Sequence, residues 1–260
     1  MEQKNRPLVP ARLPSVIIIV VEVNSMEIYE YGDKSSGIVL IQPVDEHSLS
    51  TLENELALIR SGIEGNIKGE AGSDKGILLA AIKVNNWNND LSPWKAPAVF
   101  GKENFGGGAA ETLHKIIRYC QDSSKAYYVG GYSLAGLFAL WAVYQTDIFE
   151  GVCAASPSMW FPGFIDYMKE NEIKCGDIYL SLGDKEEKAK NPVMATVGDC
   201  IRTAEKMLKE KERNCILEWN EGNHFKDPDI RTAKGFAWLL NHTRKKYRKY
   251  VDNNLNPNKL

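Results

Sequence analysis

The feature that most constrains the fold of this chain is an alternation of short apolar runs with longer helical patterns. The runs predicted to form strands cover residues 16–23, 26–31, 37–42, 77–84, 126–130, 151–155, 178–182 and 215–219. Strands that alternate with helices are typical of an α/β fold, in which helices cover both faces of a mainly parallel sheet. Such sheets bind ligands at the carboxyl ends of their strands. We therefore expect a functional site in the loops that follow strands.

The helices between these strands are predicted from apolar spacing and end signals. Leu52, Leu56, Ile59 and Ile63 fall on one helix face, with Ser50 or Thr51 as cap and Gly62 near the end. Residues 134–144 are apolar nearly all round, as in a helix buried against a sheet. Further helices are expected over residues 113–120, from the Asn191-Pro192 pair through 208, and from Asp227-Pro228 through 240.

Length and composition exclude several classes of protein. The chain has 260 residues, 43% of them hydrophobic, and a formal net charge of −2. A disordered chain would have fewer apolar residues and more net charge, and a chain of this length needs no disulfide or metal to fold. The balance of charge argues against a surface that attracts nucleic acid everywhere. We expect a single domain over residues 1–260, with an N-terminal arm at 1–15 and a basic helix end and polar tail at 241–260.

Cysteine usage and apolar run length predict a cytoplasmic protein. The five cysteines are widely spaced, odd in number and without a C-x-x-C pair, so neither a disulfide framework nor a zinc cage is expected. The longest apolar run, 16–21, is far shorter than the roughly 18 residues of a membrane span. Five basic residues within 244–249 are interpreted as a solvated helix end rather than a surface for nucleic acid or anionic lipid.

One predicted strand-to-helix turn has the residues expected around a nucleophilic serine. It reads Gly130-Gly131-Tyr132-Ser133-Leu134-Ala135-Gly136. The pattern G-x-S-x-G holds a serine on a sharp turn with its hydroxyl exposed above the sheet edge, and here Ala135 stands in the place of the last glycine. The P-loop and G-x-G-x-x-G nucleotide-binding patterns do not fit these glycines. The alternative is a glycine-rich turn without catalysis, so the interpretation depends on partner residues.

The partners that such a serine needs follow it in the expected order. A serine hydroxyl is a poor nucleophile at neutral pH unless a base accepts its proton and an acid orients that base. Asp184, Glu186 and Glu187 follow the strand at 178–182, and His224 lies in the loop after the strand at 215–219. We predict Ser133 as nucleophile, His224 as base and Glu186, three residues beyond the turn glycine, as acid. Asp184 and Glu187 remain alternatives for the acid.

Several segments carry a resemblance to a known family. They are the elbow at 131–140, Ala154-Ala155-Ser156-Pro157-Ser158-Met159-Trp160, the late Gly222-Asn223-His224-Phe225, and Asp90-Leu91-Ser92-Pro93-Trp94 before the elbow. Together they resemble the α/β-hydrolase fold, and more narrowly the esterase family that includes siderophore (enterochelin-type) esterases, feruloyl esterases and esterase D. The resemblance covers residues 37–240 approximately and is most specific over residues 133–160.

The resemblance implies an α/β-hydrolase fold and a serine esterase that cleaves an ester through an acyl-enzyme intermediate. The backbone N–H of Leu134 is expected to be one oxyanion donor, and Asp45, after the strand at 37–42, is the candidate for the second. The chain departs from the family at this second position, where Gln42-Pro43-Val44-Asp45 replaces the frequent His-Gly. Tyr132, Trp94 and Trp160 are candidate substrate contacts.

The expected partner is a small-molecule ester, with no metal, cofactor, nucleic acid or membrane involved. The sequence does not predict the oligomeric state. Two alternatives remain open, an acyltransferase that uses the same three residues and an inactive hydrolase-fold protein that only binds. The order of serine, acid and histidine along the chain argues against the inactive protein.

Overall fold

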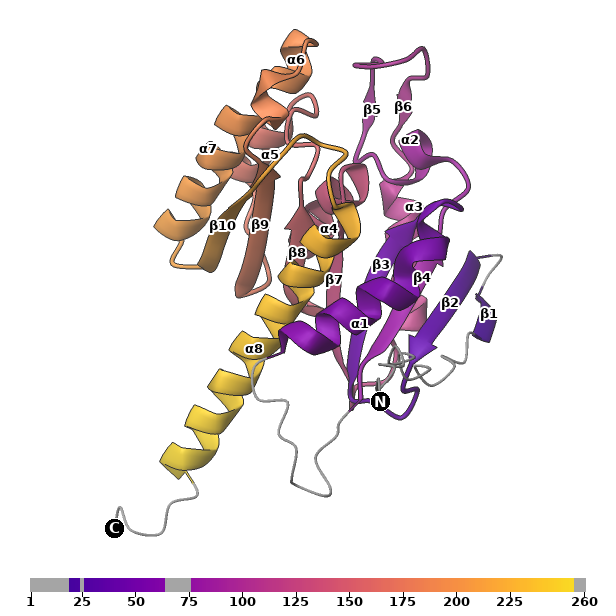
Figure 1. Ribbon diagram of the computed structural model, residues 1–260, viewed down its shortest axis with the longest axis vertical. Helices are drawn as coiled ribbons and strands as arrows, with labels where there is room; N and C mark the ends of the chain where they lie inside the picture. Colours follow the sequence, from indigo (N-terminus) through magenta and orange to yellow (C-terminus); the bar gives the residue numbers. More distant parts are fainter. Residues whose placement is uncertain (1–18, 24–25, 64–75, 255–260) are drawn as a thin grey trace, which may run out of the picture.

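In the computed structural model, which describes residues 19–23, 26–63 and 76–254, eight strands form one sheet in the order β1-β2-β4-β3-β7-β8-β9-β10 (Figure 1). The strands are β1 Ile19–Val23, β2 Met26–Gly32, β3 Ile38–Val44, β4 Leu78–Lys83, β7 Ala126–Tyr132, β8 Phe149–Ala155, β9 Asp177–Gly183 and β10 Asn214–Asn220. From β4 to β10 all neighbours are parallel, whereas β2 runs antiparallel to both β1 and β4. The mainly parallel sheet predicted from the sequence is confirmed.

Helices cover the two faces of this sheet. They are α1 Leu52–Gly62, α2 Trp87–Asp90, α3 Ala109–Tyr119, α4 Leu134–Gln145, α5 Phe164–Glu170, α6 Pro192–Ala195, α7 Val197–Glu210 and α8 Pro228–Asn254. The short 3-10 turns η1 Ser48–Thr51 and η2 Glu186–Lys188, and a hairpin of β5 Lys95–Ala96 and β6 Phe105–Gly106, complete the described elements.

The apolar core is divided by the sheet into two layers. Strand side chains alternate between faces, so Val39 and Ile41 of β3 join the core beneath α3, α4 and α7, while Leu40 joins the core beneath α1 and α8. Helices α1 and α8 also pack on each other, and Figure 1 shows both crossing the same face of the sheet. The predicted inward face of α1 is confirmed, because Leu52, Leu56 and Ile59 have no exposed surface.

The sheet order places the serine turn at a reversal of direction. The chain passes from β3 to its neighbour β4 and then crosses back to add β7 on the other side of β3. The loops after β3 and β7 therefore diverge in opposite directions, which leaves space for a ligand between them. Ser133 follows β7, and Asp45 follows β3.

The structure differs from the sequence-based expectation in three places. The helix expected from Asn191 is two helices, α6 and α7, that meet at Thr196. Between the strand predicted at 77–84 and the elbow, the structure contains α2 and the β5–β6 hairpin, which were not predicted, and α5 was not predicted either. The last helix extends to Asn254 and so includes the basic run at 244–249 that was expected at a helix end.

Some expected features lie wholly or partly outside the described residues. The N-terminal arm at 1–15, residues 16–18 of the first strand and the end of the tail at 255–260 belong to this group. Within the part of the chain that the structure describes, no helix is both long and apolar enough to cross a membrane.

Candidate active site

Ser133 lies on a strained turn between β7 and α4. Its φ of 60° and ψ of −121° fall in a region that non-glycine residues rarely adopt. The turn is tight enough that a Cβ at Gly131 would stand 2.7 Å from the Cβ of Ala135. Ala135 therefore fits in the place of the usual glycine because Gly131 has no side chain. This is the geometry of a nucleophile elbow.

The structure brings the side chains of Ser133, His224 and Glu186 together in a hydrogen-bonded chain. Ser133 Oγ is 3.0 Å from His224 Nε2, and His224 Nδ1 is 2.7 Å from Glu186 Oε2. The carboxylate accepts from Nδ1, which leaves Nε2 as the acceptor for the serine hydroxyl. His224 is half-buried, whereas the Glu186 side chain is 3% exposed.

Glu186 is held as a carboxylate by several donors. Its Oε1 accepts from the Gly183 N–H at 2.7 Å and from Ser156 Oγ at 2.8 Å. Burial acts to raise the pKa of Glu186, but the hydrogen bond and charge of His224 and the bonds from Gly183 and Ser156 hold the pKa below its ordinary value. An ionised Glu186 is suited to fix the orientation of the His224 ring.

The other two candidate acids lie elsewhere. Asp184 is exposed, and its Oδ1 accepts from the N–H of Gly222 at 2.7 Å, which links the loop after β9 to the loop after β10. Glu187 forms an ion pair with Arg202 of α7 at 2.9 Å. Of these three carboxylates, only Glu186 forms a hydrogen bond with His224 in the part of the chain that the structure describes.

The two candidate oxyanion donors stand in neighbouring loops. Leu134 is the first residue of α4, directly after Ser133. Asp45 is half-buried in the loop after β3, the strand next to β7, and its Oδ1 accepts from the N–H and the hydroxyl of Ser48. A third polar group lies near the serine, since Ser158 Oγ is 3.4 Å from Ser133 Oγ and Ser158 is 2% exposed.

Trp94 and Trp160 belong to one aromatic cluster. Trp160 lies two residues after Ser158, whose hydroxyl contacts Ser133. Trp160 is 8% exposed and lies against Phe100 and Phe105. Trp94 is half-buried, stacks on Phe164 and donates its indole N–H to the carbonyl of Pro162.

Tyr132 has a different environment, because its hydroxyl holds the histidine loop. This hydroxyl donates to the backbone carbonyl of His224 at 2.7 Å, and the rings of the two residues lie 5.2 Å apart. Burial raises the pKa of Tyr132 to about 12, so the hydroxyl keeps its proton over the ordinary pH range.

Sequence reasoning assigned no role to Ser156 or Ser158, which contact Glu186 and Ser133, and it also missed Arg231 of α8. Arg231 is 1% exposed and donates to Glu186 Oε1 at 2.8 Å. No sequence signal marks it, because a charged residue in the first turns of a helix is normally assigned to solvent.

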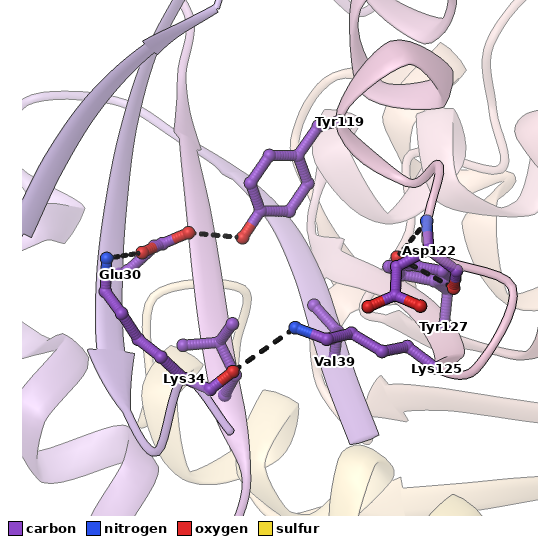
Figure 2. A pocket seen from close by; sticks show the side chains of 8 residues that line it. Glu30, Lys34, Val39, Tyr119, Asp122, Lys125 and Tyr127 are labelled. Atoms are coloured by element: carbon purple, nitrogen blue, oxygen red, sulfur yellow. Dashed lines mark hydrogen bonds and ion pairs between the residues drawn. The ribbon is translucent and has the colours of Figure 1, made fainter. Parts of the chain in front are cut away.

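Two features away from the serine bear on other kinds of chemistry. Among the residues that the structure describes, no three His, Cys, Asp or Glu side chains are grouped as a metal site would require. A cavity of about 260 Å³ lies at the opposite edge of the sheet, where β3, β4 and β7 begin (Figure 2). Its Glu30 pairs with Lys34 and accepts from Tyr119, so these polar groups satisfy one another.

The sheet order and the serine elbow after β7 together define an α/β-hydrolase fold. No family model matches the sequence, and no curated protein matches it. Solved structures share the fold at low sequence identity. The siderophore hydrolase EstA from Aspergillus nidulans is 18% identical with a TM-score of 0.65, and the match covers 94% of this chain and 100% of that one.

Two further structures extend the likeness. An IroE-like serine hydrolase from Shewanella oneidensis is 14% identical with a TM-score of 0.67, covering 92% of this chain and 87% of that one. A ferulic acid esterase is 11% identical with a TM-score of 0.54, covering 86% of this chain and 97% of that one. The fold implied by the sequence resemblance is confirmed by these structures.

Proposed function

We propose that this chain is a serine esterase in which Ser133, His224 and Glu186 form the catalytic triad. The observation that carries the proposal is the continuous hydrogen-bonded chain from Ser133 Oγ through the His224 ring to Glu186 Oε2. Such a chain activates a hydroxyl that is otherwise unreactive near neutral pH. The strained backbone at Ser133 supports the same conclusion, because strain of this kind is typical of nucleophile elbows.

The reaction would proceed in two steps. His224 Nε2 takes the proton of Ser133 as Oγ attacks the ester carbonyl, and the proton then goes to the leaving alcohol as the C–O bond breaks. Water repeats the sequence on the acyl-enzyme and releases the acid. Glu186 stabilises the imidazolium that forms in both steps. The N–H of Leu134 would bind the oxyanion, with a second donor from the loop that contains Asp45.

The substrate class is proposed from the aromatic side chains and from the named neighbours. Trp160 lies two residues after Ser158, which contacts Ser133, and Trp94 packs against the neighbouring Phe161. The neighbours are named as a siderophore hydrolase and a ferulic acid esterase. We propose a small ester as substrate, with Trp94, Trp160 and Tyr132 as candidate contacts, and one catalytic domain acting in the cytoplasm.

The experiment that tests this proposal is labelling with a fluorophosphonate probe together with hydrolysis of p-nitrophenyl esters. Wild-type protein is expected to be labelled at Ser133 and to release p-nitrophenol. Ser133→Ala is expected to lose labelling and at least about 10³-fold in kcat. Ser61→Ala, which alters an exposed serine of α1, is the matched control and is expected to behave as wild type.

Two outcomes would count against the proposal. The first is a folded wild-type protein that is neither labelled nor active on any ester of a panel that varies acyl chain length and includes aryl esters. That result would indicate an inactive hydrolase-fold protein that only binds. Labelling at Ser133 with product appearing mainly on an added alcohol, rather than as free acid, would identify an acyltransferase instead.

A further inference from the structure

Arg231 is a fully buried arginine whose contacts join the triad acid to the loop that carries the triad base. One guanidinium nitrogen, Nη1, lies 2.8 Å from Glu186 Oε1, 3.0 Å from Ser156 Oγ and 3.1 Å from Tyr132 Oη. The other, Nη2, donates to the carbonyls of Glu221 and Asn223 at 3.2 and 3.0 Å. These acceptors come from four different segments of the chain.

Burying the Arg231 guanidinium is unfavourable in free energy unless its charge is paired. An isolated charge in a low-dielectric interior is strongly unfavourable, so buried arginines are held by ion pairs and multiple acceptors. Here the side chains of Arg231 and Glu186 are 2% and 3% exposed and form an ion pair. The pair places a positive charge on the oxygen of Glu186 that faces away from His224.

The same side chain also fixes the position of the base. Glu221 and Asn223 stand on either side of Gly222, immediately before His224. Tyr132, which accepts from Arg231, in turn donates to the His224 carbonyl. Arg231 therefore contacts the histidine loop both directly and through Tyr132.

We propose that Arg231 is a positioning residue that keeps Glu186 ionised and holds the His224 loop at the distance from Ser133 that proton transfer requires. This inference rests on the proposed esterase function. The guanidinium is buried behind the acid and acts only through Glu186 and the loop. Its loss is therefore expected to lower kcat and to leave KM nearly unchanged.

The charge of Arg231 also has a consequence for pH dependence. The titratable side chains that face the ion pair are Tyr132 from β7 and His224 from the loop after β10, with Asp184 bonded to Gly222 of the same loop. Without the guanidinium, the buried carboxylate loses its countercharge. The Glu186–His224 pair then binds a proton more tightly, and the acid limb of kcat/KM moves to higher pH.

The test compares Arg231→Met and Arg231→Lys with wild type. Arg231→Met is expected to lower kcat about 10²-fold, with KM within about threefold and the acid limb raised by about one pH unit. Arg231→Lys keeps the charge but cannot reach Glu186 and both carbonyls, so it is expected to lose about tenfold in kcat with the acid limb at its wild-type pH. Arg202→Met removes the exposed arginine that pairs with Glu187 and is the matched control, expected at wild-type activity.

The outcomes separate this inference from the proposed function. The inference would be overturned if Arg231→Met kept the wild-type kcat and the wild-type acid limb of kcat/KM. It would also be overturned if kcat fell while the acid limb stayed at its wild-type pH, because that result indicates a purely structural role. If Arg231→Met does not fold, wild-type kcat in Arg231→Lys overturns it and the expected tenfold loss supports it. If wild-type protein is inactive, the proposed function is wrong, and the inference is then tested by NMR titration of His224, whose protonation pH must rise in Arg231→Met.

Discussion

At the scale of single residues, the candidate site depends on which of three neighbouring carboxylates faces the histidine. Sequence order alone left Asp184, Glu186 and Glu187 open. Their environments differ in the structure, since Glu186 is buried against His224 while Glu187 pairs with Arg202 and Asp184 bonds to a backbone N–H. Each carboxylate therefore has a different expected effect on activity.

Glu186→Gln is expected to lower kcat about 10²- to 10⁴-fold, because an amide neither fixes the His224 tautomer nor stabilises the imidazolium. Asp184→Asn is expected to cause a much smaller loss, because its backbone link to Gly222 is a loop contact outside the hydrogen-bonded chain. Steady-state kinetics on one p-nitrophenyl ester distinguishes them. The reverse order, with Asp184→Asn the more damaged variant, would assign the acid role to Asp184.

A second single-residue prediction concerns Glu55 of α1, which is 2% exposed. Burial raises the pKa of Glu55 to about 8 from 4.5, although a hydrogen bond from Gln42 acts in the opposite direction. The folded state holds this proton more tightly than the unfolded chain does, so protonation of Glu55 adds to the free energy of unfolding. This contribution is complete below pH 4.5. It is lost as pH rises to about 8, at about 1.4 kcal/mol per pH unit.

Glu55→Gln is expected to remove this slope and to be more stable than wild type at pH 9. Urea unfolding at pH 5, 7 and 9 measures the free energy of unfolding directly. Glu53→Gln, an exposed position of the same helix, is the control and is expected to keep the wild-type slope. Parallel pH curves for wild type and Glu55→Gln would contradict the prediction.

Arg231 shows why part of the site could not be predicted at this scale. Ser133, His224 and Glu186 could be predicted as candidate site residues because their chemistry is tied to loops at strand ends. The burial of Arg231 depends on acceptors from four segments that meet only in the folded chain. The residues next to Arg231 in α8 give no sequence signal that these acceptors meet around it.

At the scale of elements, the elbow between β7 and α4 depends on small residues at fixed positions. Gly131→Ala would place a methyl group 2.7 Å from Ala135 Cβ and 2.9 Å from the Ala135 carbonyl carbon. Overpacking of this kind costs about 1–3 kcal/mol, and here it would displace Ser133. We expect a lower Tm and a lower kcat, measured by thermal unfolding and ester hydrolysis.

Ala135→Gly restores the more common elbow pattern and is the control for this prediction, with activity expected near wild type. The double variant removes the contact between the two methyl groups, so it is expected to recover part of the Tm lost in Gly131→Ala. If Gly131→Ala matches wild type in both Tm and kcat, the close approach of β7 and α4 affects neither stability nor activity.

The elements that sequence reasoning missed were short or lacked an inward face. Asn191 does cap a helix, accepting from Val193 and Met194, but that helix ends within one turn. Thr196 bonds back to the Val193 carbonyl, and the apolar spacing begins only at Val197. Helix α5 has just two buried side chains, Phe164 and Met168, too few to give a periodic pattern.

At the scale of the whole molecule, the candidate site is formed at the carboxyl ends of neighbouring parallel strands. Ser133, Ser156, Glu186 and His224 follow β7, β8, β9 and β10, four consecutive strands of the parallel region. The sequence placed Ser133, Glu186 and His224 at strand exits because these are recognisable from apolar runs, but it assigned no role to Ser156. The contacts that lock the four loops together required the folded structure.

The distance along the chain between Ser133 and His224 has a consequence for how the protein is made. The two residues that share a hydrogen bond are 91 positions apart, and β10 is the last strand to be synthesised. At about 5–20 residues per second, a ribosome needs roughly five to twenty seconds to pass from one to the other. A nascent chain therefore contains Ser133 for several seconds before His224 is made. On the function proposed above, it can gain activity only after β10 and the loop that follows it have been synthesised.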